Sequence, residues 1–267
     1  MTIEEHFGFT ATPFTRELPI DKRLGLAMLD EQAETLEDII KRRMSALLIA
    51  PAGSGKTVVL RSVAHRLPQA RFCVSYFKLS RLSGRDLCRE IAHAIGARSA
   101  GTYPALVRVV QERFQQSFST DGVRPVLIFD DAHALRPEGF ELIKILTNYE
   151  MDSRLVVSIV LAGHPSLKDK LYRTELEDIR QRISHCGELR LLSRDECVSY
   201  IKHRLHIVGA TTVPFDSESM EAIYEMSRGN MRAIDCLAFL ALKNAALAGA
   251  KTASAQHVHQ ARSQVWL

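Results

Sequence analysis

Residues 46–57 read Ala-Leu-Leu-Ile-Ala-Pro-Ala-Gly-Ser-Gly-Lys-Thr, an apolar run followed by a glycine-rich turn. This order is typical of a phosphate-binding loop, because glycines let backbone N–H groups point at phosphate oxygens without a Cβ in the way. The pattern usually starts with a glycine, and this chain has the small residue Ala50 there. We expect the loop to bind ATP through Pro51, Ala52, Gly53, Ser54, Gly55, Lys56, Thr57 and Val58.

Two side chains of this loop have defined tasks in such a site. Lys56 would reach the β- and γ-phosphates, and the Thr57 hydroxyl would ligate Mg²⁺. Residues 58–64, Val-Val-Leu-Arg-Ser-Val-Ala, predict a helix whose N-terminus faces the triphosphate. A chance glycine loop is the alternative, and the apolar strand before it and the helix after it argue against that alternative.

The composition is that of an ordinary globular protein. The chain has 267 residues, of which 46% are hydrophobic and 25% charged, enough for one or two packed domains. The longest apolar stretch, residues 155–162, is too short to cross a bilayer, and the N-terminus lacks the layout of a signal peptide. We therefore expect a cytoplasmic protein. Five scattered cysteines indicate reduced thiols that serve as small core residues: Cys73, Cys88, Cys186, Cys197 and Cys236.

Positive charge is concentrated in one segment. Residues 56–113 hold 11 Lys or Arg against 3 Asp or Glu, a net +8 in a chain whose total is +4. Such a block suggests a surface that faces a polyanion. Solvated helix faces are the alternative explanation.

Strand and helix patterns alternate over the first two thirds of the chain. This alternation predicts an α/β fold with a mostly parallel sheet that helices cover on both faces. The aromatic segment 7–14 is expected to pack on this main domain as an N-terminal arm. The predicted strands are 45–50, 71–77, 125–131 and 155–161, with an edge strand at 186–191, and the helices are 30–44, 58–64, 84–96, 103–118 and 137–149.

The strand patterns stop at Ser193. Ser193 and Glu196 have the spacing of a capping box, in which each side chain caps the other's backbone N–H at a helix start. Helices are predicted at 194–208, 216–227, 230–248 and 254–265. The sequence thus predicts two domains: a nucleotide-binding α/β domain, 1–192, with an arm at 1–30, and an all-helical lid, 193–267.

Asp130 and Asp131 follow the apolar strand 125–129. The carboxyl end of a parallel strand is where open sheets bind ligands. We expect Asp130 to hold Mg²⁺, directly or through water, and Asp131 to act as general base on the attacking water. Aspartate is one methylene shorter than the glutamate common at the second position, which suggests slow hydrolysis. The alternative role for Asp131 is an N-cap of the next helix.

Three further residues are candidates for contact with the γ-phosphate. His164 follows the strand 155–161 and could align the water, or make only local hydrogen bonds. Arg182, favoured over Arg180, could reach a neighbouring subunit's ATP, or form a surface salt bridge. Arg232, after the turn at Gly229, could fold onto the phosphate and couple the lid's angle to the nucleotide.

The order of these motifs resembles that of the AAA+ ATPases, over nearly the whole chain. Within that class, the chain is most similar to the ExeA-like group, which includes the MuB- and TniB-type transposition ATPases. The segments that carry the similarity are Phe7-Gly8-Phe9 with Pro13-Phe14, Gly53-Ser54-Gly55-Lys56-Thr57, Phe129-Asp130-Asp131-Ala132-His133, Leu161-Ala162-Gly163-His164-Pro165, Arg182 and Gly229-Asn230-Met231-Arg232.

This resemblance implies an ATP-dependent regulator of DNA transposition. Such ATPases assemble as rings or helical filaments on double-stranded DNA, recruit or activate a transposase, and disassemble upon hydrolysis. Lys78, Arg81 and Arg85 are the expected contacts to the DNA backbone, although the two arginines could instead only cap and solvate a helix start.

Two other functions remain open. One is a secretion or envelope assembly ATPase of the ExeA type, whose members are longer and carry a membrane span and a cell-wall-binding part. The end of this chain at residue 267 favours the stand-alone type in that comparison. The other is an NTPase that switches a protein partner and never touches DNA.

Overall fold

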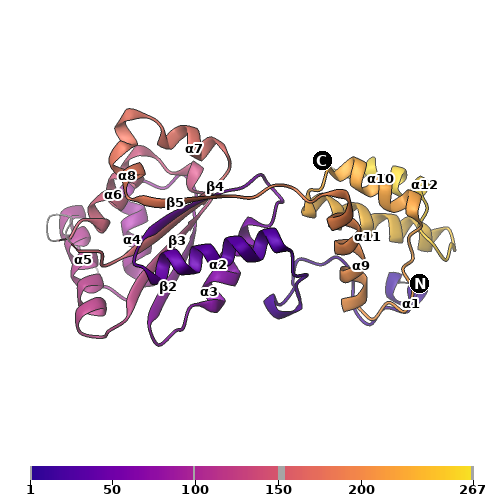
Figure 1. The fold of residues 1–267 in the computed structure, drawn as a ribbon, viewed down its shortest axis with the longest axis horizontal. Coiled ribbons are helices and arrows are strands. Elements are labelled where there is room, and N and C mark those ends of the chain that lie inside the picture. The colour runs from indigo at the N-terminus through magenta and orange to yellow at the C-terminus, as the bar shows by residue number, and fades with distance from the viewer. Residues whose placement is uncertain (1, 99, 150–153, 266–267) are drawn as a thin grey trace. The chain divides into compact units, whose positions relative to one another are not determined.

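The computed structural model describes residues 2–98, 100–149 and 154–265, which form two compact units (Figure 1). The sheet unit consists of Ala27–Pro51 and Lys56–Leu189. The helical unit consists of Met1–Leu26, Ala52–Gly55 and Arg190–Leu267. Each unit is described by itself.

The sheet unit is built on five parallel strands in the order β2-β3-β4-β1-β5. The strands are β1 (Ser45–Ile49), β2 (Phe72–Lys78), β3 (Arg124–Asp130), β4 (Ser158–Gly163) and β5 (Ile183–Glu188). Their carboxyl ends lie at one edge of the sheet, so the residues that follow β1, β3 and β4 come together there. The predicted α/β fold with a parallel sheet is confirmed.

Both faces of the sheet are buried. On one face, alternate residues such as Leu47, Leu127 and Leu161 share a core with α4, α5 and α6. The residues between them, such as Leu48 and Val160, are also buried, and α2 packs against β1 and α3. The helices of this unit are α2 (Ala27–Lys41), α3 (Lys56–Arg66), α4 (Gly84–Ala94), α5 (Tyr103–Ser119), α6 (Pro137–Thr147), α7 (Ser166–Leu171) and α8 (Glu177–Gln181), with the 3-10 turns η2 (Ala132–Ala134) and η3 (Thr174–Leu176).

Two strands differ from their predicted positions. β4 begins at Ser158, three residues later than the apolar run suggested. β5 is an edge strand as predicted, but it covers 183–188 and not 186–191. Its pairing with β1 contains a register irregularity at Ser45, and its side chains are mostly exposed, so it lacks the apolar pattern of a central strand.

The helical unit contains four longer helices and the N-terminal arm. The predicted capping box at Ser193 is present, with the Ser193 N–H donating to Glu196 (2.8 Å) and the Glu196 N–H to Ser193 Oγ (3.3 Å). The elements are α1 (Ile3–Phe7), η1 (Ile20–Lys22), α9 (Arg194–Ile207), α10 (Ser217–Ser227), α11 (Met231–Leu247) and α12 (Ala255–Arg262).

The arm packs with these helices, whereas the sequence placed it on the main domain. A guanidinium nitrogen of Arg204 in α9 donates to the backbone oxygen of Thr15, and the same guanidinium lies 5.8 Å from the centre of the Phe14 ring. His203 Nε2 also lies 2.9 Å from Lys22 O. The backbone oxygens of Thr15 and Lys22 and the Phe14 ring therefore have their partners on α9.

Residues 52–55 group with the helical unit as well. The Met231 N–H donates to Gly53 O (2.9 Å), and Asn230 Nδ2 donates to Ala52 O (3.0 Å). Gly53 has φ +76°, and a Cβ on it would overlap the Asn230 amide. Only glycine fits this position, both for its backbone conformation and for its close approach.

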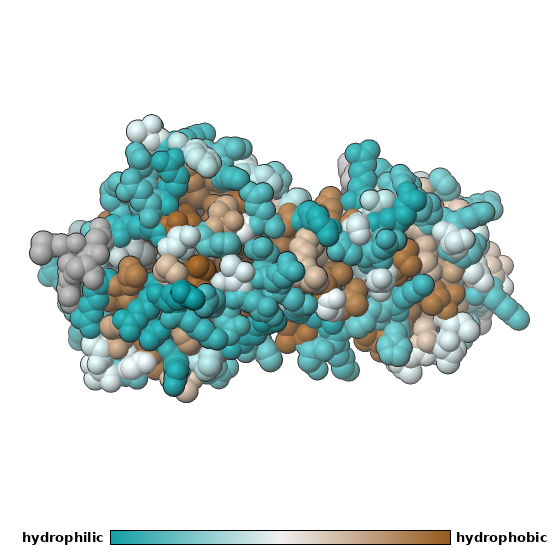
Figure 2. Space-filling view, in the orientation of Figure 1, coloured by the Kyte–Doolittle hydropathy of each residue, from teal (hydrophilic) through white to brown (hydrophobic). Residues whose placement is uncertain are grey.

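The cysteines are free thiols as expected, but only some of them serve as core residues. All five are free thiols, and Cys88 and Cys197 are buried, but Cys73, Cys186 and Cys236 are exposed and do not fill the core. Among the described residues, no helix is both long and apolar enough to cross a membrane. On the face shown in Figure 2, hydrophobic residues are interspersed among hydrophilic ones.

Candidate functional site

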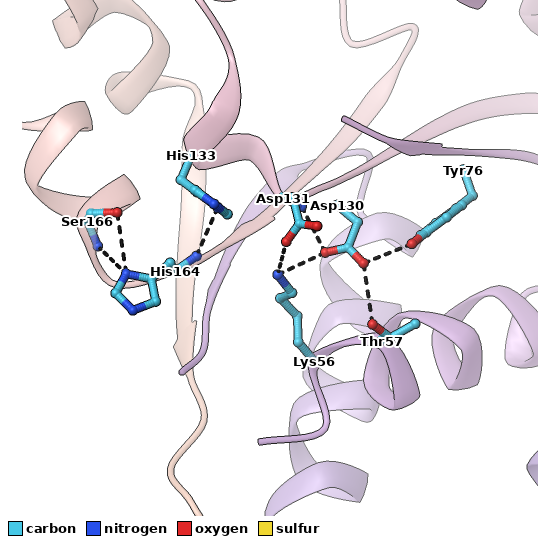
Figure 3. A network of polar contacts seen from close by, with 8 residues as sticks. All are labelled: Lys56, Thr57, Tyr76, Asp130, Asp131, His133, His164 and Ser166. Carbon is cyan, nitrogen blue, oxygen red and sulfur yellow. Dashed lines mark hydrogen bonds and ion pairs between the residues drawn. The ribbon is translucent and has the colours of Figure 1, made fainter. Parts of the chain in front are cut away.

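Lys56 meets two carboxylates at the carboxyl edge of the sheet (Figure 3). Its Nζ lies 3.0 Å from Asp130 Oδ1 and 2.7 Å from Asp131 Oδ1. Lys56 begins α3, directly after the glycine loop, while Asp130 ends β3 and Asp131 follows it as the N-cap of η2. One cation thus faces two carboxylates, which leaves negative charge and acceptor capacity for a further cation.

Asp130 is the most buried of these groups, with 3% of its surface exposed. Its Oδ1 also accepts the Asp131 N–H (2.8 Å). Its Oδ2 accepts the Tyr76 hydroxyl (2.8 Å) and lies 3.4 Å from Thr57 Oγ1. We call these five residues, Lys56, Thr57, Tyr76, Asp130 and Asp131, the Asp130 cluster. A charge so deeply buried persists only when donors surround it, and both oxygens here have them.

Asp131 has an unusual backbone conformation, with φ +56° and ψ +35°. Aspartate tolerates this left-handed region better than most residues, and the geometry turns the chain from β3 into η2. Burial raises the pKa of the Asp131 carboxyl, but the hydrogen bond and charge of Lys56, with the charges of His133 and Lys78, outweigh burial and hold this pKa below its usual value. The carboxylate is therefore ionised at neutral pH, as a base or a metal-water ligand requires.

Two histidines lie beside this cluster. The His164 N–H lies 3.4 Å from His133 Nδ1, while the His164 ring is exposed and 3.4 Å from Ser166 Oγ (Figure 3). His133 is the closer of the two to the charges: burial lowers its pKa and the charge of Asp131 opposes that shift. The local hydrogen-bonding role of His164, left open by the sequence, matches these contacts.

The residues present fit Mg²⁺ and a triphosphate. The Thr57 hydroxyl and the Asp130 carboxylate are hard oxygen donors of the kind that Mg²⁺ prefers. Gly53 and Gly55 have φ values of +76° and +96°, which let successive N–H groups of the loop face one way. Ser54 between them is fully buried. The other residues of the loop expected to contact nucleotide, Pro51, Ala52 and Val58, are exposed or partly exposed.

Arg182 caps the C-terminal end of α8 in a partly buried position. It lines a small apolar pocket with residues of β1, α6, β4 and α8. Arg180 pairs with Glu177 (3.2 Å) and lies over the Tyr172 ring. The surface salt bridge considered as an alternative is thus present at Arg180, and a role of Arg182 in a neighbouring subunit stays a prediction.

The remaining predicted residues are all exposed. Arg232 follows the N-cap Asn230, whose side-chain oxygen accepts the Arg232 N–H (3.0 Å). Arg81 lies in the loop between β2 and α4, and Arg85 donates to Gly101 O (3.0 Å) from the first turn of α4. Lys78 ends β2 opposite Asp130 in the strand register, near enough to Asp131 to lower its pKa.

Sequence reasoning assigned no role to Tyr76 or His133. Tyr76 lies mid-strand, and only the adjacency of β2 and β3 in the sheet brings its hydroxyl to Asp130. For His133 a signal existed, because it lies within the segment that carries Asp130 and Asp131.

Comparison with known sequences gives one family and one relative. Residues 39–171 match the family described as an AAA domain. General secretion pathway protein A of Aeromonas hydrophila is 28% identical over 199 residues, which cover 73% of this chain and 36% of that protein. The matched region is thus little more than a third of that relative's length.

Solved structures share the fold at low sequence identity. Cdc6p from Pyrobaculum aerophilum has a TM-score of 0.75 at 16% identity, over 95% of this chain and 70% of that one. Aeropyrum pernix ORC1, solved in complex with DNA, has a TM-score of 0.70 at 18% identity, over 92% and 68%. The RuvB Holliday junction branch migration motor of Thermotoga maritima scores 0.60 at 18% identity, over 94% and 73%. The fold is therefore that of the AAA+ P-loop proteins.

Proposed function

We propose that this chain, which carries an AAA domain over residues 39–171, is a Mg²⁺-dependent ATPase whose ATP-bound form assembles on double-stranded DNA and regulates transposition. The observation that carries the ATPase part is the Asp130 cluster. Lys56 of the glycine loop lies within hydrogen-bonding distance of the carboxylates that follow β3. This geometry supports the proposal, because it brings a lysine, a threonine hydroxyl and two carboxylates to one edge of the sheet, where they could bind phosphate and Mg²⁺.

Four residues of the cluster have a task in this proposal. Lys56 leaves its carboxylates for the β- and γ-phosphates, and Thr57 and Asp130 hold Mg²⁺. When bound, Mg²⁺ neutralises charge on the phosphate oxygens. Asp131, released from Lys56, accepts a hydrogen bond from the attacking water and takes its proton. Arg182 of a neighbouring subunit and Arg232 of the helical unit complete the site, with His164 or His133 aligning the water.

The DNA part of the proposal rests on charge and on fold. Lys78, Arg81 and Arg85 are exposed around the loop that joins β2 to α4. Contacts from this loop to phosphates would be independent of DNA sequence, which suits a protein that selects targets for a transposase. Two proteins of the same fold, Aeropyrum ORC1 and Drosophila ORC, were solved with DNA bound.

The experiment is binding of the 267-residue chain to duplex DNA of arbitrary sequence, with a slowly hydrolysed ATP analogue, with ADP and without nucleotide. We expect tight binding only with the analogue, and a steep decrease in affinity between about 50 and 200 mM salt. Electron microscopy of the same samples would show rings or filaments. A protein that binds the analogue but ignores DNA at low salt contradicts the DNA part and leaves the ATPase part standing.

A second function, ATP-driven assembly of a secretion apparatus, is favoured by the match to general secretion pathway protein A. In that case the ATP-bound form engages a protein partner at the cell envelope. Nucleotide-dependent self-assembly that DNA neither promotes nor stabilises would support this function over the first.

A further inference from the structure

We propose that Tyr76 is a positioning residue of the ATP site: its hydroxyl holds the Asp130 carboxylate in place for Mg²⁺ while Lys56 moves to the phosphates. This inference rests on the proposed ATPase function. The observation behind it is the 2.8 Å hydrogen bond from the Tyr76 hydroxyl to Asp130 Oδ2 (Figure 3).

The need for such a residue follows from the contacts of Asp130. Four groups surround its two oxygens: Lys56 Nζ and the Asp131 N–H at Oδ1, and the hydroxyls of Tyr76 and Thr57 at Oδ2. A bound triphosphate would take Lys56 as its partner, and the Thr57 hydroxyl would help to hold a bound Mg²⁺. The buried carboxylate is then left with the Asp131 N–H and Tyr76.

These two remaining donors act on different oxygens. The Asp131 N–H fixes Oδ1, and the Tyr76 hydroxyl fixes Oδ2, so together they set the plane of the carboxylate. Without Tyr76, Oδ2 loses the short hydrogen bond, and the carboxylate can rotate about its bond to Cβ. Partners that orient a metal's ligands in this way are worth about 10- to 100-fold in metal affinity.

The placement of Tyr76 on β2 makes this role possible without a cost in core packing. β2 is an edge strand next to β3, and Tyr76 pairs with Ile128, two residues before Asp130. Tyr76 is 47% exposed, so much of it lies outside the core. Tyr76 is large and half exposed, and its hydroxyl reaches the Asp130 carboxylate, which is only 3% exposed. Its role is therefore polar and not hydrophobic.

The test compares Tyr76→Phe with the wild-type chain and with Tyr172→Phe. The control removes one hydroxyl from another exposed tyrosine of the same unit, whose ring lies against Arg180. Two readouts apply: fluorescence binding of a mant-labelled, slowly hydrolysed ATP analogue as Mg²⁺ is titrated, and Mn²⁺ binding followed by electron paramagnetic resonance in the presence of the unlabelled analogue.

For Tyr76→Phe we expect the metal concentration at half-saturation to rise about tenfold in both readouts. Affinity for the analogue without metal should stay within a factor of about two, as should every parameter of Tyr172→Phe. An unchanged metal requirement in Tyr76→Phe overturns the inference, and so does an equal loss of affinity with and without metal. A wild-type chain that binds no analogue at any Mg²⁺ concentration refutes the proposed function itself.

Discussion

Two clusters of charged side chains among the described residues each join a cation to aspartate and tyrosine, but they differ in how exposed they are. The Asp130 cluster in the sheet unit has one lysine, one threonine, two aspartates and a tyrosine. The second, which we call the Asp235 cluster, lies in the helical unit and consists of Tyr200, Arg204 and Asp235. There the Tyr200 hydroxyl lies 3.1 Å from Asp235 Oδ1, and Arg204 lies 2.9 Å from the Tyr200 hydroxyl and 3.4 Å from Asp235 Oδ2.

The two clusters differ in how completely their charges are balanced and covered by the protein. Arg204 and Asp235 balance each other, and the arm covers the guanidinium with the Thr15 backbone oxygen and the Phe14 ring. Asp130 and Asp131 share one lysine, and the side chain of Asp131 is 34% exposed. The Asp235 cluster is neutral and covered, so it holds the arm against α9. The Asp130 cluster is unbalanced and accessible, so its side chains can exchange their present partners for a ligand. Burial of charge alone therefore does not identify a site.

Lys56→Ala tests the Asp130 cluster and should have the largest effect of the variants considered. We expect it to lose about 1,000-fold in affinity for ATP, or about 4 kcal/mol, because the phosphates lose their only cation from the glycine loop. Stability should fall by no more than about 1 kcal/mol, since Asp130 keeps three donors, the Asp131 N–H and the hydroxyls of Tyr76 and Thr57, and Asp131 is accessible to water. Isothermal calorimetry with an ATP analogue and urea unfolding measure the two quantities. Lys168→Ala, at an exposed ion pair with Glu188, is the control. Normal ATP affinity in Lys56→Ala would remove the phosphate-loop assignment.

Arg204→Leu tests the sealed cluster. It should cost about 3 kcal/mol of unfolding free energy at pH 7.5, because it leaves Asp235 charged and buried without its cation. Burial already raises the pKa of Asp235 to about 6, against the charge of Arg204 and the Tyr200 hydrogen bond, which lower it. Without Arg204 this folded-state pKa rises further above the unfolded value.

The sign of the pH effect follows from that shift. A carboxyl whose pKa is higher in the folded state favours folding as it gains a proton, so the loss in Arg204→Leu should shrink when pH falls from 7.5 to 5. Urea unfolding followed by circular dichroism at both pH values measures it. An equal loss at both would mean that the variant suffers from lost packing against Phe14 and not from an orphaned charge.

Asp131→Asn separates binding from chemistry within the open cluster. The amide keeps the size of the side chain but cannot take a proton, so we expect hydrolysis to slow about 100-fold while ATP affinity changes little. DNA complexes formed with ATP should last correspondingly longer. Phosphate release under single-turnover conditions is the measurement, with Asp131→Glu as the matched variant that retains the carboxylate. Wild-type turnover in Asp131→Asn would leave this residue with only its backbone role at the start of η2.

The contrast between the clusters also shows what the sequence could and could not predict. Local patterns were enough for the glycine loop, the central strands and the acids at the end of β3, because each depends on neighbours in the chain. Strand order and the partner of the arm depend on contacts between distant segments. The roles of Tyr76 and Arg204 were missed for that reason. The Tyr76 hydroxyl on β2 contacts Asp130 on β3, and Arg204 contacts Thr15, which lies 189 residues away in the sequence. The pairing of Asp131 with Lys56 has the same origin.

The smallest effect expected concerns Arg81 and Arg85, whose replacement together by alanine should leave both clusters untouched. If each arginine contacts one phosphate, the double variant should lower the steepness of the plot of log affinity against log salt by about 1.8. The matched control is Arg89→Ala, since Arg89 also lies on α4 but pairs with Asp86 at 3.1 Å. An ion-paired arginine releases no DNA counterion unless it first leaves its partner, so the control should keep the wild-type slope. A double variant with the wild-type slope would mean that the loop after β2 does not face DNA, and the net charge of +8 in residues 56–113 would then be explained by solvated helix faces.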